Sequence, residues 1–391
     1  MSAMKRLFQV MADKKASDIF MSVGAPINIK INGVAVPVNQ AIMTSDTVRQ
    51  LLYEVLNERQ IKEFEDEMEL NTAISVEGVG SFRVSAFRQK GAPAVVVRYI
   101  PNLIPPLDTL GLPEVVKEVI MQKRGLILMV GATGSGKSTS LAAMIDYRNE
   151  RKSGHILTLE DPVEFIFQNK KSIVNQREVG TDTQTLETAL KNALRQAPDC
   201  ILIGEIRDKQ TMAMSLAYAQ SGHLCLATLH ANNSYHAMNR IISFYPLENR
   251  PTLLLDLSAA LQAIISQRLV RTKTGARRAA VEVLLNTRHV AELIEKGDIN
   301  EIKDAMEKSM APGSQTFEQA LFKQFMEGSI TQEECMANAD SATNMLWLIN
   351  QATAGSIPAA PKAEDKAGEK KEGLLSAGGA SFGNIKIDMN A

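Results

Sequence analysis

The chain has 391 residues, of which 45% are apolar and 22% charged, and its formal net charge is −1. At roughly 100–200 residues per domain, this length predicts two or three domains, and the near-neutral charge argues against direct binding of nucleic-acid phosphates. The three cysteines, Cys200, Cys225 and Cys335, form no CxxC pair, so we expect neither a zinc site nor a disulfide framework, and a reducing, cytoplasmic setting is favoured. The sequence contains no long uncharged apolar run and no secretory signal pattern at its start, so no transmembrane segment is expected.

Residues 1–100 are predicted to form a small α+β domain. Residues 27–31 alternate in polarity and meet Asn32 and Gly33, a pair typical of β-hairpin turns. Thr44 is placed to cap a helix that continues to about Leu56, and strand-like runs follow at residues 73–76, 82–87 and 94–100. Residues 101–113 contain four prolines, which predicts a semi-rigid linker.

Residues 114–285 change to short apolar runs that alternate with helical patterns. The runs at residues 125–130, 156–159, 200–203 and 224–228 each suit a buried parallel strand. Strands that alternate with helices predict a doubly wound α/β core. Residues 286–350 have amphipathic helical patterns, and residues 351–391 are so rich in Ala, Gly, Lys and Glu that we expect a disordered tail.

The sharpest signal is a phosphate-binding loop. The sequence from Gly131 to Thr139 reads GATGSGKST, follows an apolar strand, precedes a helical segment and satisfies the pattern G-x-x-x-x-G-K-[ST]. We expect the backbone N–H groups to surround the phosphates of ATP, Lys137 to reach the β- and γ-phosphates, and the Ser138 hydroxyl to bind Mg²⁺. The predicted nucleotide-binding residues are Gly131, Thr133, Gly134, Ser135, Gly136, Lys137, Ser138 and Thr139.

Carboxylates follow two of the predicted strands. Glu205 comes after residues 200–203, and Gly204 stands where many such proteins have a Mg²⁺-binding aspartate, so Glu205 is predicted to orient or deprotonate the attacking water. Glu160, Asp161 and Glu164 follow the strand at residues 156–159, at the sheet edge where ligands bind in open α/β sheets.

The predicted metal site consists of Ser138, Glu205, Glu160 and Asp161, with the acidic groups acting through water, and Glu164 is a candidate for positioning the nucleophilic water. A salt-bridge role for Glu205 and a solvated loop at residues 160–164 remain the alternative interpretations.

Two histidines bracket the predicted strand at residues 224–229. His223 and His230 are seven residues apart, so a strand would place them at opposite ends, and they are not expected to share a metal. His230, at the carboxyl end, is a candidate sensor of the γ-phosphate. A structural role for either histidine also stays open.

Together these motifs resemble the secretion-ATPase superfamily in its type IV pilus retraction branch, over about residues 1–350. The segments that carry the resemblance are residues 131–139, 158–165 (the family's Asp box), 204–208 (its atypical Walker B motif) and 221–230 (its His box). The resemblance implies a PAS-like N-terminal domain, a RecA-like ATPase core and a hexameric ring, with ATP between the two domains and neighbouring subunits completing the site. It also implies that Arg83 and Arg98, in strand-like runs predicted to point to one side, act as arginine fingers. Without it, both would be interpreted as solvated edge residues.

Departures from the family pattern indicate which group of these ATPases the chain most resembles. The chain is short and lacks the CxxC pairs of many extension and secretion ATPases. Phe20 stands where the retraction signature commonly has histidine, Glu292 and Glu295 stand near the places of two arginines, and a polar tail follows residue 352. These features resemble the accessory, PilU-type group.

The implied protein is a cytoplasmic motor at the inner-membrane face of a pilus machine, with a paralogous retraction ATPase and a platform protein as partners. A motor of a related secretion or DNA-uptake system remains an alternative. A non-hydrolysing adaptor ring is a second alternative, although the intact Lys137, Ser138 and Glu205 argue against it.

Overall fold

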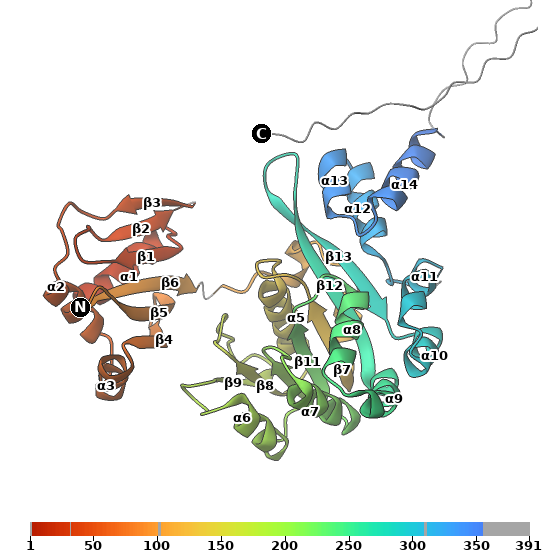
Figure 1. Ribbon diagram of the computed structural model, residues 1–391, viewed down its shortest axis with the longest axis horizontal. Coiled ribbons are helices and arrows are strands. Elements are labelled where there is room, and N and C mark those ends of the chain that lie inside the picture. Colours follow the sequence, from red (N-terminus) through yellow and green to blue (C-terminus); the bar gives the residue numbers. More distant parts are fainter. Residues whose placement is uncertain (1, 32, 101–102, 309–310, 355–391) are drawn as a thin grey trace, which may run out of the picture. The chain divides into compact units, whose positions relative to one another are not determined.

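The computed structural model describes residues 2–31, 33–100, 103–308 and 311–354 (Figure 1). Of the predicted disordered tail, residues 355–391 lie outside the described residues, whereas residues 351–354 belong to the helix Ala342–Ala354, so the tail does not begin at residue 351 as predicted. In the described ranges, no helix is long and apolar enough to cross a membrane.

The N-terminal part is built on an antiparallel sheet with strand order β3-β2-β1-β6-β5-β4. Its apolar side chains form one core with the helices, in which Phe8 stacks on Phe82 with ring centroids 4.1 Å apart. The strands are β1 Asp18–Met21, β2 Asn28–Ile31, β3 Val34–Pro37, β4 Glu69–Val76, β5 Gly80–Gln89 and β6 Ala92–Ile100, and the helices are α1 Ala3–Asp13, α2 Ser45–Tyr53 and α3 Glu58–Glu67.

Local sequence signals explain several of these elements. Thr44 caps α2 by accepting a hydrogen bond from the N–H of Thr47, as predicted, but the helix ends at Tyr53 rather than near Leu56. The expected hairpin is present, since β2 pairs antiparallel with β3 and Ile31 faces Val34. The three predicted strand runs at residues 73–100 correspond to β4, β5 and β6, each longer than expected.

The second sheet has strand order β13-β12-β7-β11-β10-β8-β9 (Figure 1). The strands from β12 to β9 run parallel to one another, and β13 pairs antiparallel with β12. These strands are β7 Gly125–Val130, β8 Gly154–Glu160, β9 Ser172–Glu178, β10 Cys200–Ile203, β11 Leu224–Leu229, β12 Leu261–Arg271 and β13 Arg277–Leu285. The predicted α/β fold class is confirmed, with all four predicted strands in place.

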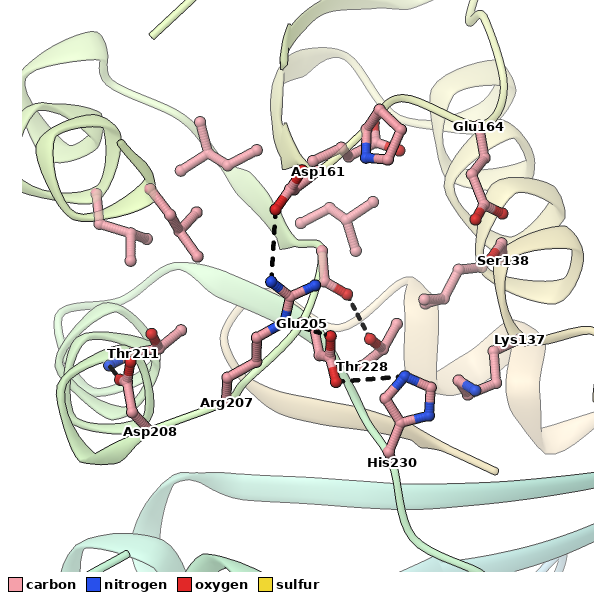
Figure 2. Close-up of a pocket in the computed structure, with 18 of the residues that line it drawn as sticks. Lys137, Ser138, Asp161, Glu164, Glu205, Arg207, Asp208, Thr211, Thr228 and His230 are labelled. Atoms are coloured by element: carbon pink, nitrogen blue, oxygen red, sulfur yellow. Dashed lines mark hydrogen bonds and ion pairs between the residues drawn. The ribbon is translucent and has the colours of Figure 1, made fainter. Parts of the chain in front are cut away.

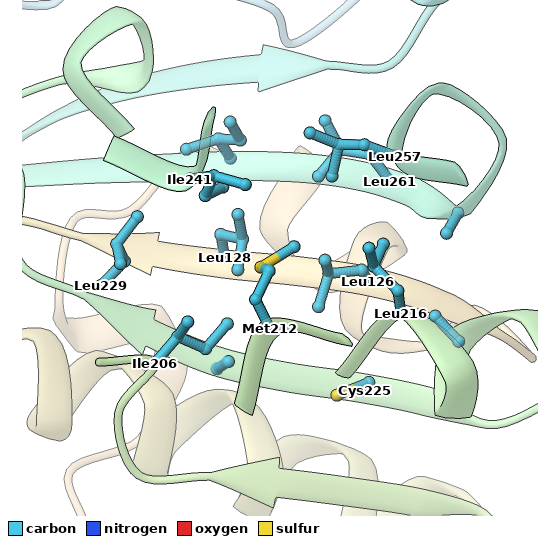
Figure 3. Packing of buried hydrophobic residues seen from close by; sticks show 14 of the residues in the cluster. Leu126, Leu128, Ile206, Met212, Leu216, Cys225, Leu229, Ile241, Leu257 and Leu261 are labelled. Carbon is cyan, nitrogen blue, oxygen red and sulfur yellow. The ribbon is translucent and has the colours of Figure 1, made fainter. Parts of the chain in front are cut away.

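Both faces of this sheet are covered, which explains the nearly continuous apolar runs. Alternate residues of β7 divide between two cores, since Leu126 and Leu128 pack on one face and Ile127 and Met129 on the other. Figure 3 shows the first core, where Leu126 and Leu128 meet side chains of the covering helices. The first face is covered by α6 Leu186–Ala193, α7 Lys209–Gln220, α8 Ser234–Ser243 and α9 Arg250–Ala260, and the second by α4 Val115–Ile120 and α5 Lys137–Arg151.

Part of the proline-containing segment also belongs to the second core. Leu107, in the short 3₁₀ helix Leu107–Thr109, is buried there, and Ile104, Leu110 and Leu112 pack against it. The helical pattern predicted for residues 286–350 is confirmed where the structure describes it. The helices are α10 Arg288–Lys296, α11 Ile302–Glu307, α12 Phe317–Met326, α13 Gln332–Asn338 and α14 Ala342–Ala354.

The parallel strands deliver their carboxyl ends to one edge of the sheet. The phosphate-binding loop follows β7, the Asp box follows β8, Gly204 follows β10 and His230 follows β11. Motifs that are far apart in the sequence therefore meet at this edge, where ligands bind in open α/β sheets.

Candidate active site

A cavity of about 520 Å³ lies at the carboxyl edge of the second sheet (Figure 2). Four motifs from different strands contribute to its lining. The predicted site residues that line it are Thr133, Gly134, Lys137, Ser138, Glu160, Asp161, Glu164, Glu205 and His230. The remaining predicted loop residues, Gly131, Ser135, Gly136 and Thr139, belong to the same loop and helix start but are not among the lining residues of this cavity.

The phosphate-binding loop connects β7 to α5. Gly134 and Gly136 have φ angles of +79° and +87°, a left-handed conformation that favours glycine. Gly136 precedes α5 and provides no side-chain cap, so the N–H groups of the first helical turn are available to an anion. The loop therefore has the backbone geometry that binds phosphate.

Lys137 lies at the start of α5 and is buried. Its Nζ donates hydrogen bonds to the carbonyls of Gly131, at 2.7 Å, and Ala132, at 2.9 Å. Burial lowers the pKa of Lys137, and the charges of Glu205 and Glu164 oppose that shift. The lysine thus lies within electrostatic reach of both carboxylates that were predicted to handle water.

The loop is held from behind by a residue that the sequence did not indicate. Gln267, on β12, is buried, and its Nε2 donates to the Ser135 carbonyl at 2.8 Å. Its Oε1 accepts a hydrogen bond from the Ser140 hydroxyl at 2.7 Å. Both ends of the amide are used, so Gln267 fixes the loop relative to the sheet. No motif marks this glutamine, and only the register of β12 beside β7 reveals it.

Glu205 has two partners at the end of β10. Arg207 donates from Nε to its carboxylate at 2.6 Å, and His230 Nε2 lies 3.3 Å from the other oxygen (Figure 2). Residues that follow β10 and β11 therefore interact at this edge of the sheet. The interactions leave Glu205 at the cavity surface, with its side chain 18% exposed.

Gly204 allows the ends of β8 and β10 to approach closely. Its N–H donates to the Leu159 carbonyl, and a Cβ at this position would lie 3.2 Å from that oxygen and 3.3 Å from Glu160 Cα. Its own carbonyl accepts a hydrogen bond from the Thr228 hydroxyl. A side chain here would push on the Asp box, which gives a physical reason for glycine where related motifs have aspartate.

The Asp box is organised by hydrogen bonds from β9. Gln176 donates to the Phe165 carbonyl at 2.7 Å and accepts from the Phe167 N–H at 2.8 Å, and Glu178 accepts from the Val163 N–H at 3.0 Å. The sequence did not indicate either residue, because β9 itself was not predicted. Alternate residues of β9 thus hold the loop that carries the predicted acidic groups.

The acidic groups of the Asp box have different surroundings. Burial raises the pKa of Glu160, whose carboxylate accepts hydrogen bonds from Thr158 Oγ1 at 2.7 Å and Gln176 Nε2 at 3.3 Å. Asp161 pairs with Arg207 at 3.4 Å, whereas Glu164 is exposed at the cavity (Figure 2).

The donors around the cavity suit Mg²⁺. In the described residues, no cluster of three or more His, Cys, Asp or Glu side chains could hold a metal by itself. The Ser138 hydroxyl and the carboxylates of Glu205, Glu160 and Asp161 nevertheless line the same cavity. Oxygen donors of this kind, completed by water and substrate phosphates, are what Mg²⁺ sites in nucleotide-binding proteins use.

Arg83 and Arg98 lie in the N-terminal sheet. They face each other across β5 and β6, so their side chains leave the same face, as predicted. Arg98 donates from Nε to Asp18 at 3.0 Å and stays 64% exposed. Arg83 Nε is buried and has no hydrogen-bond partner among the described residues.

His223 and His230 lie at opposite ends of β11, as predicted. His223 Nδ1 is within hydrogen-bond distance of the Ser221 hydroxyl and the Tyr218 carbonyl. Only His230 lines the cavity.

The loop after β7 and the acidic and histidine residues at neighbouring strand ends define a nucleotide-binding protein of the P-loop class. The profile of the family described as type II/IV secretion system protein matches residues 2–283. The chain is 49% identical over 346 residues to the type IV pilus ATPase PilU of Pseudomonas aeruginosa, which covers 88% of this chain and 91% of that protein. It is 38% identical to the type IV pilus retraction ATPase PilT of the same organism, over 85% of this chain and 97% of that protein.

The fold agrees with these similarities. A crystal structure of the pilus retraction motor PilT with bound ADP superposes with a TM-score of 0.83 at 38% identity, covering 88% of this chain and 98% of that one. The chain belongs to the type II/IV secretion protein family, and within it to the retraction ATPases of the PilT and PilU branch. The identity of 49% to PilU against 38% to PilT confirms the predicted PilU type.

Proposed function

We propose that this protein hydrolyses ATP and uses the energy to help retract type IV pilus fibres. The observation that carries the proposal is that Lys137 and Glu205 lie in one cavity and interact electrostatically. A lysine that binds phosphate and a carboxylate that activates water must share one cavity for hydrolysis. If Glu205 were only a salt-bridge partner, it would have no need to lie in the same cavity as Lys137.

Each site residue has a role in this proposal. The loop from Gly131 to Thr139 holds the phosphates, with Lys137 on the β- and γ-phosphates. Glu205 orients or deprotonates the attacking water, and His230, 3.3 Å from that carboxylate, responds to the γ-phosphate. Glu164 is exposed in the same cavity and is proposed to help position the water.

Mg²⁺ would be held by the Ser138 hydroxyl and, through water, by Glu205, Glu160 and Asp161. When bound, it neutralises charge on the phosphate oxygens. These residues line the cavity in which the phosphates would lie.

The working unit is proposed to be a homohexamer whose sites are completed by arginines of the N-terminal sheet. Arg98 is exposed, and Arg83 is its register partner on the neighbouring strand. Both side chains therefore leave the same face of the sheet, which could contact a nucleotide. An arginine finger stabilises the charge that develops during phosphoryl transfer.

The accessory role, beside a paralogous retraction ATPase and a platform protein of the inner membrane, is supported by the PilU similarity. Closure of domains on ATP and their release after hydrolysis would convert phosphate contacts into rigid-body motion. A motor of a related secretion system is the second candidate, because the family profile covers such proteins as well.

An ATPase assay on purified protein tests the enzymatic part of the proposal. Lys137→Ala should abolish turnover, because no other cationic side chain lies on the loop between β7 and α5, while circular dichroism and the melting temperature stay close to wild type. Turnover at the wild-type rate by Lys137→Ala would show that the phosphate-binding loop is not the site of hydrolysis.

A further inference from the structure

Two consecutive residues in the second half of β12, Gln267 and Arg268, contact different parts of the molecule. Gln267 bonds the phosphate-binding loop, as described above. Arg268 follows it in the strand, so its side chain points to the opposite face of the sheet. β12 therefore links the phosphate-binding loop to whatever Arg268 contacts.

Arg268 joins three segments that are distant in sequence. Its guanidinium donates to the Asn232 carbonyl at 3.1 Å, to the Asn338 carbonyl at the end of α13, and to the carboxylate of Asp340. It also lies over the ring of Phe317, the first residue of α12, at 3.9 Å. The side chains of Arg268 and Asp340 are only 21% and 16% exposed. A pair this well enclosed is screened less than a surface ion pair.

Asp340 closes the link from the other side. Its second oxygen accepts a hydrogen bond from Asn233 Nδ2 at 2.7 Å. Asn233 is the N-cap of α8, and its own oxygen accepts from the His236 N–H at 2.9 Å. Arg268 therefore binds the backbone of Asn232, and Asp340 binds the side chain of Asn233, the next residue.

The turn at Asn232 and Asn233 lies just beyond His230, which follows β11. Asn232 is two residues beyond His230, whose Nε2 lies 3.3 Å from the Glu205 carboxylate. On the far side of the turn, the Ser234 N–H donates to the buried Glu282 at 2.7 Å. A shift of the turn would therefore move His230 relative to Glu205.

We propose that Arg268 and Asp340 are positioning residues for ATP hydrolysis, which fix the turn after His230 and couple it to the packing of α12 and α13. The inference rests on the proposed ATPase function. A lysine cannot replace Arg268, because one ammonium group lacks the planar fork that reaches two carbonyls, a carboxylate and an aromatic face together.

The chain offers a matched control. Arg278, on the neighbouring strand β13, donates to Glu327 at 2.9 Å and to the Ser329 hydroxyl at 2.7 Å, near the end of α12. The Arg278–Glu327 ion pair also joins the β12–β13 hairpin to the C-terminal helices, but neither residue is bonded to the turn after His230. Arg278→Lys therefore reports the cost of loosening the helices alone.

Steady-state ATPase kinetics of Arg268→Lys, Asp340→Asn and Arg278→Lys provide the first test. Arg268→Lys and Asp340→Asn should each lower kcat by about 10–100-fold with little change in KM for ATP, because misplacement of a catalytic group costs rate rather than binding. Arg278→Lys should leave kcat near wild type. Equal kcat values in Arg268→Lys and Arg278→Lys would overturn the proposal.

A double-mutant cycle separates positioning from general destabilisation. If Arg268 acts through His230, Arg268→Lys should cost much less kcat in a His230→Ala background than in the wild type. Fully additive effects would mean that Arg268 does not act through His230, and would overturn the proposal.

Hydrogen–deuterium exchange provides a readout that does not require turnover. The amides of residues 231–236 should exchange faster in Arg268→Lys and Asp340→Asn than in Arg278→Lys. Unchanged exchange in these amides would show that the pair does not hold the turn. A wild-type protein that binds ATP without hydrolysing it would contradict the proposed function instead, and the exchange result would then decide the structural part of this inference by itself.

Discussion

Glu205 follows the buried strand β10 and lines the cavity, where its carboxylate lies between Arg207 and His230. Arg207 bonds one carboxylate oxygen and His230 approaches the other, so the carboxylate is oriented rather than free to rotate. An oriented carboxylate in the same cavity as Lys137 is an arrangement that suits general-base help in hydrolysis. This residue therefore carries the chemical part of the proposed mechanism.

Glu205→Gln keeps the size of the side chain and removes its charge. We expect ATP to bind with nearly unchanged affinity while kcat falls by roughly 10²–10⁴-fold, the usual contribution of acid–base catalysis. Binding of a fluorescent nucleotide analogue and steady-state turnover measure the two effects separately.

Glu187→Gln is the matched control, since Glu187 lines the same cavity but pairs with Lys191 on the surface of α6. It should retain turnover. A Glu205→Gln protein that no longer binds nucleotide would indicate a structural or metal-binding role in place of the catalytic one.

The residues of the site differ in how far the sequence could predict them. Lys137 was predicted from the pattern G-x-x-x-x-G-K-[ST]. Glu205 and His230 were predicted because they come just after short apolar runs, and parallel strands bring such ends together. Gln267 and Gln176 were missed, because they are single glutamines whose partners are set by strand register. No local pattern encodes such a contact, so only the folded sheet reveals it.

At the scale of elements, the sequence predicted β7, β8, β10 and β11 of the second sheet, but not β9, β12 or β13. β7 and β10 are short, wholly buried runs, and the structure reproduces the bounds predicted from the sequence. β12 and β13 form a long antiparallel ladder whose residues are mostly buried without alternation, so their polarity gives no strand signal, and the turn at Gly275 was not interpreted as a hairpin. Helix α2 began where its cap predicted but ended early, since caps mark starts better than polarity marks ends.

Glu282 on β13 gives a pH-dependent prediction at this scale. The carboxyl is buried, accepts hydrogen bonds from the Ser234 N–H and the Ser266 hydroxyl, and lies near Asp340. Burial is the main cause that raises its pKa. The folded state therefore holds this proton to higher pH than the unfolded state, so the stability that Glu282 contributes is present at low pH and is lost as pH rises through the folded-state pKa.

Glu282→Gln should remove this loss, because the amide stays neutral. We expect the variant and the wild type to melt at similar temperatures near about pH 4.5, and the variant to become the more stable protein towards pH 8, by about 1.4 kcal/mol for each unit of pKa difference. Thermal melts across this pH range measure the difference.

Glu327→Gln serves as the comparison, since Glu327 is a partly exposed partner of Arg278. Its pH profile should follow that of the wild type. A Glu282→Gln protein that is less stable than the wild type at neutral pH would show that the carboxylate is favoured in its buried position.

For the whole molecule, the arginines of the N-terminal sheet test whether subunits complete one another's sites. Arg83→Ala or Arg98→Ala should lower turnover by about 10³–10⁵-fold if the side chain acts as an arginine finger. Mixing Arg98→Ala protein with Lys137→Ala protein should restore part of the activity, because each mixed ring would contain some sites with both groups intact.

Mass measurement of the mixed rings provides the control for subunit exchange. Mixed rings that form and remain inactive would exclude an arginine that acts across a subunit interface. Asp18→Asn is a useful companion, since Asp18 holds Arg98 at 3.0 Å and its loss should release the arginine without removing it.

The protein family was predictable from the sequence, whereas the way in which the protein assembles with its partners was not. The combined motifs were specific enough to indicate the retraction branch, and the similarity to PilU confirms it. Glu292 and Glu295 are exposed on α10, and Phe20 is half-buried on β1. We predict that the two carboxylates change partner choice through charge complementarity rather than the fold. Their effect belongs to an assembly of several chains, and a single chain's sequence does not encode its partners' surfaces.

Direct scoring of pilus retraction in living cells tests the central claim most directly. The gene is replaced by its Lys137→Ala allele in cells that keep the paralogous retraction ATPase and in cells that lack it. We predict weaker or less frequent retraction than with the wild-type gene when the paralogue is present, and no retraction with either allele when it is absent. Retraction that is indifferent to Lys137→Ala would contradict an ATP-driven role, and efficient retraction by the wild-type protein alone would contradict the accessory role.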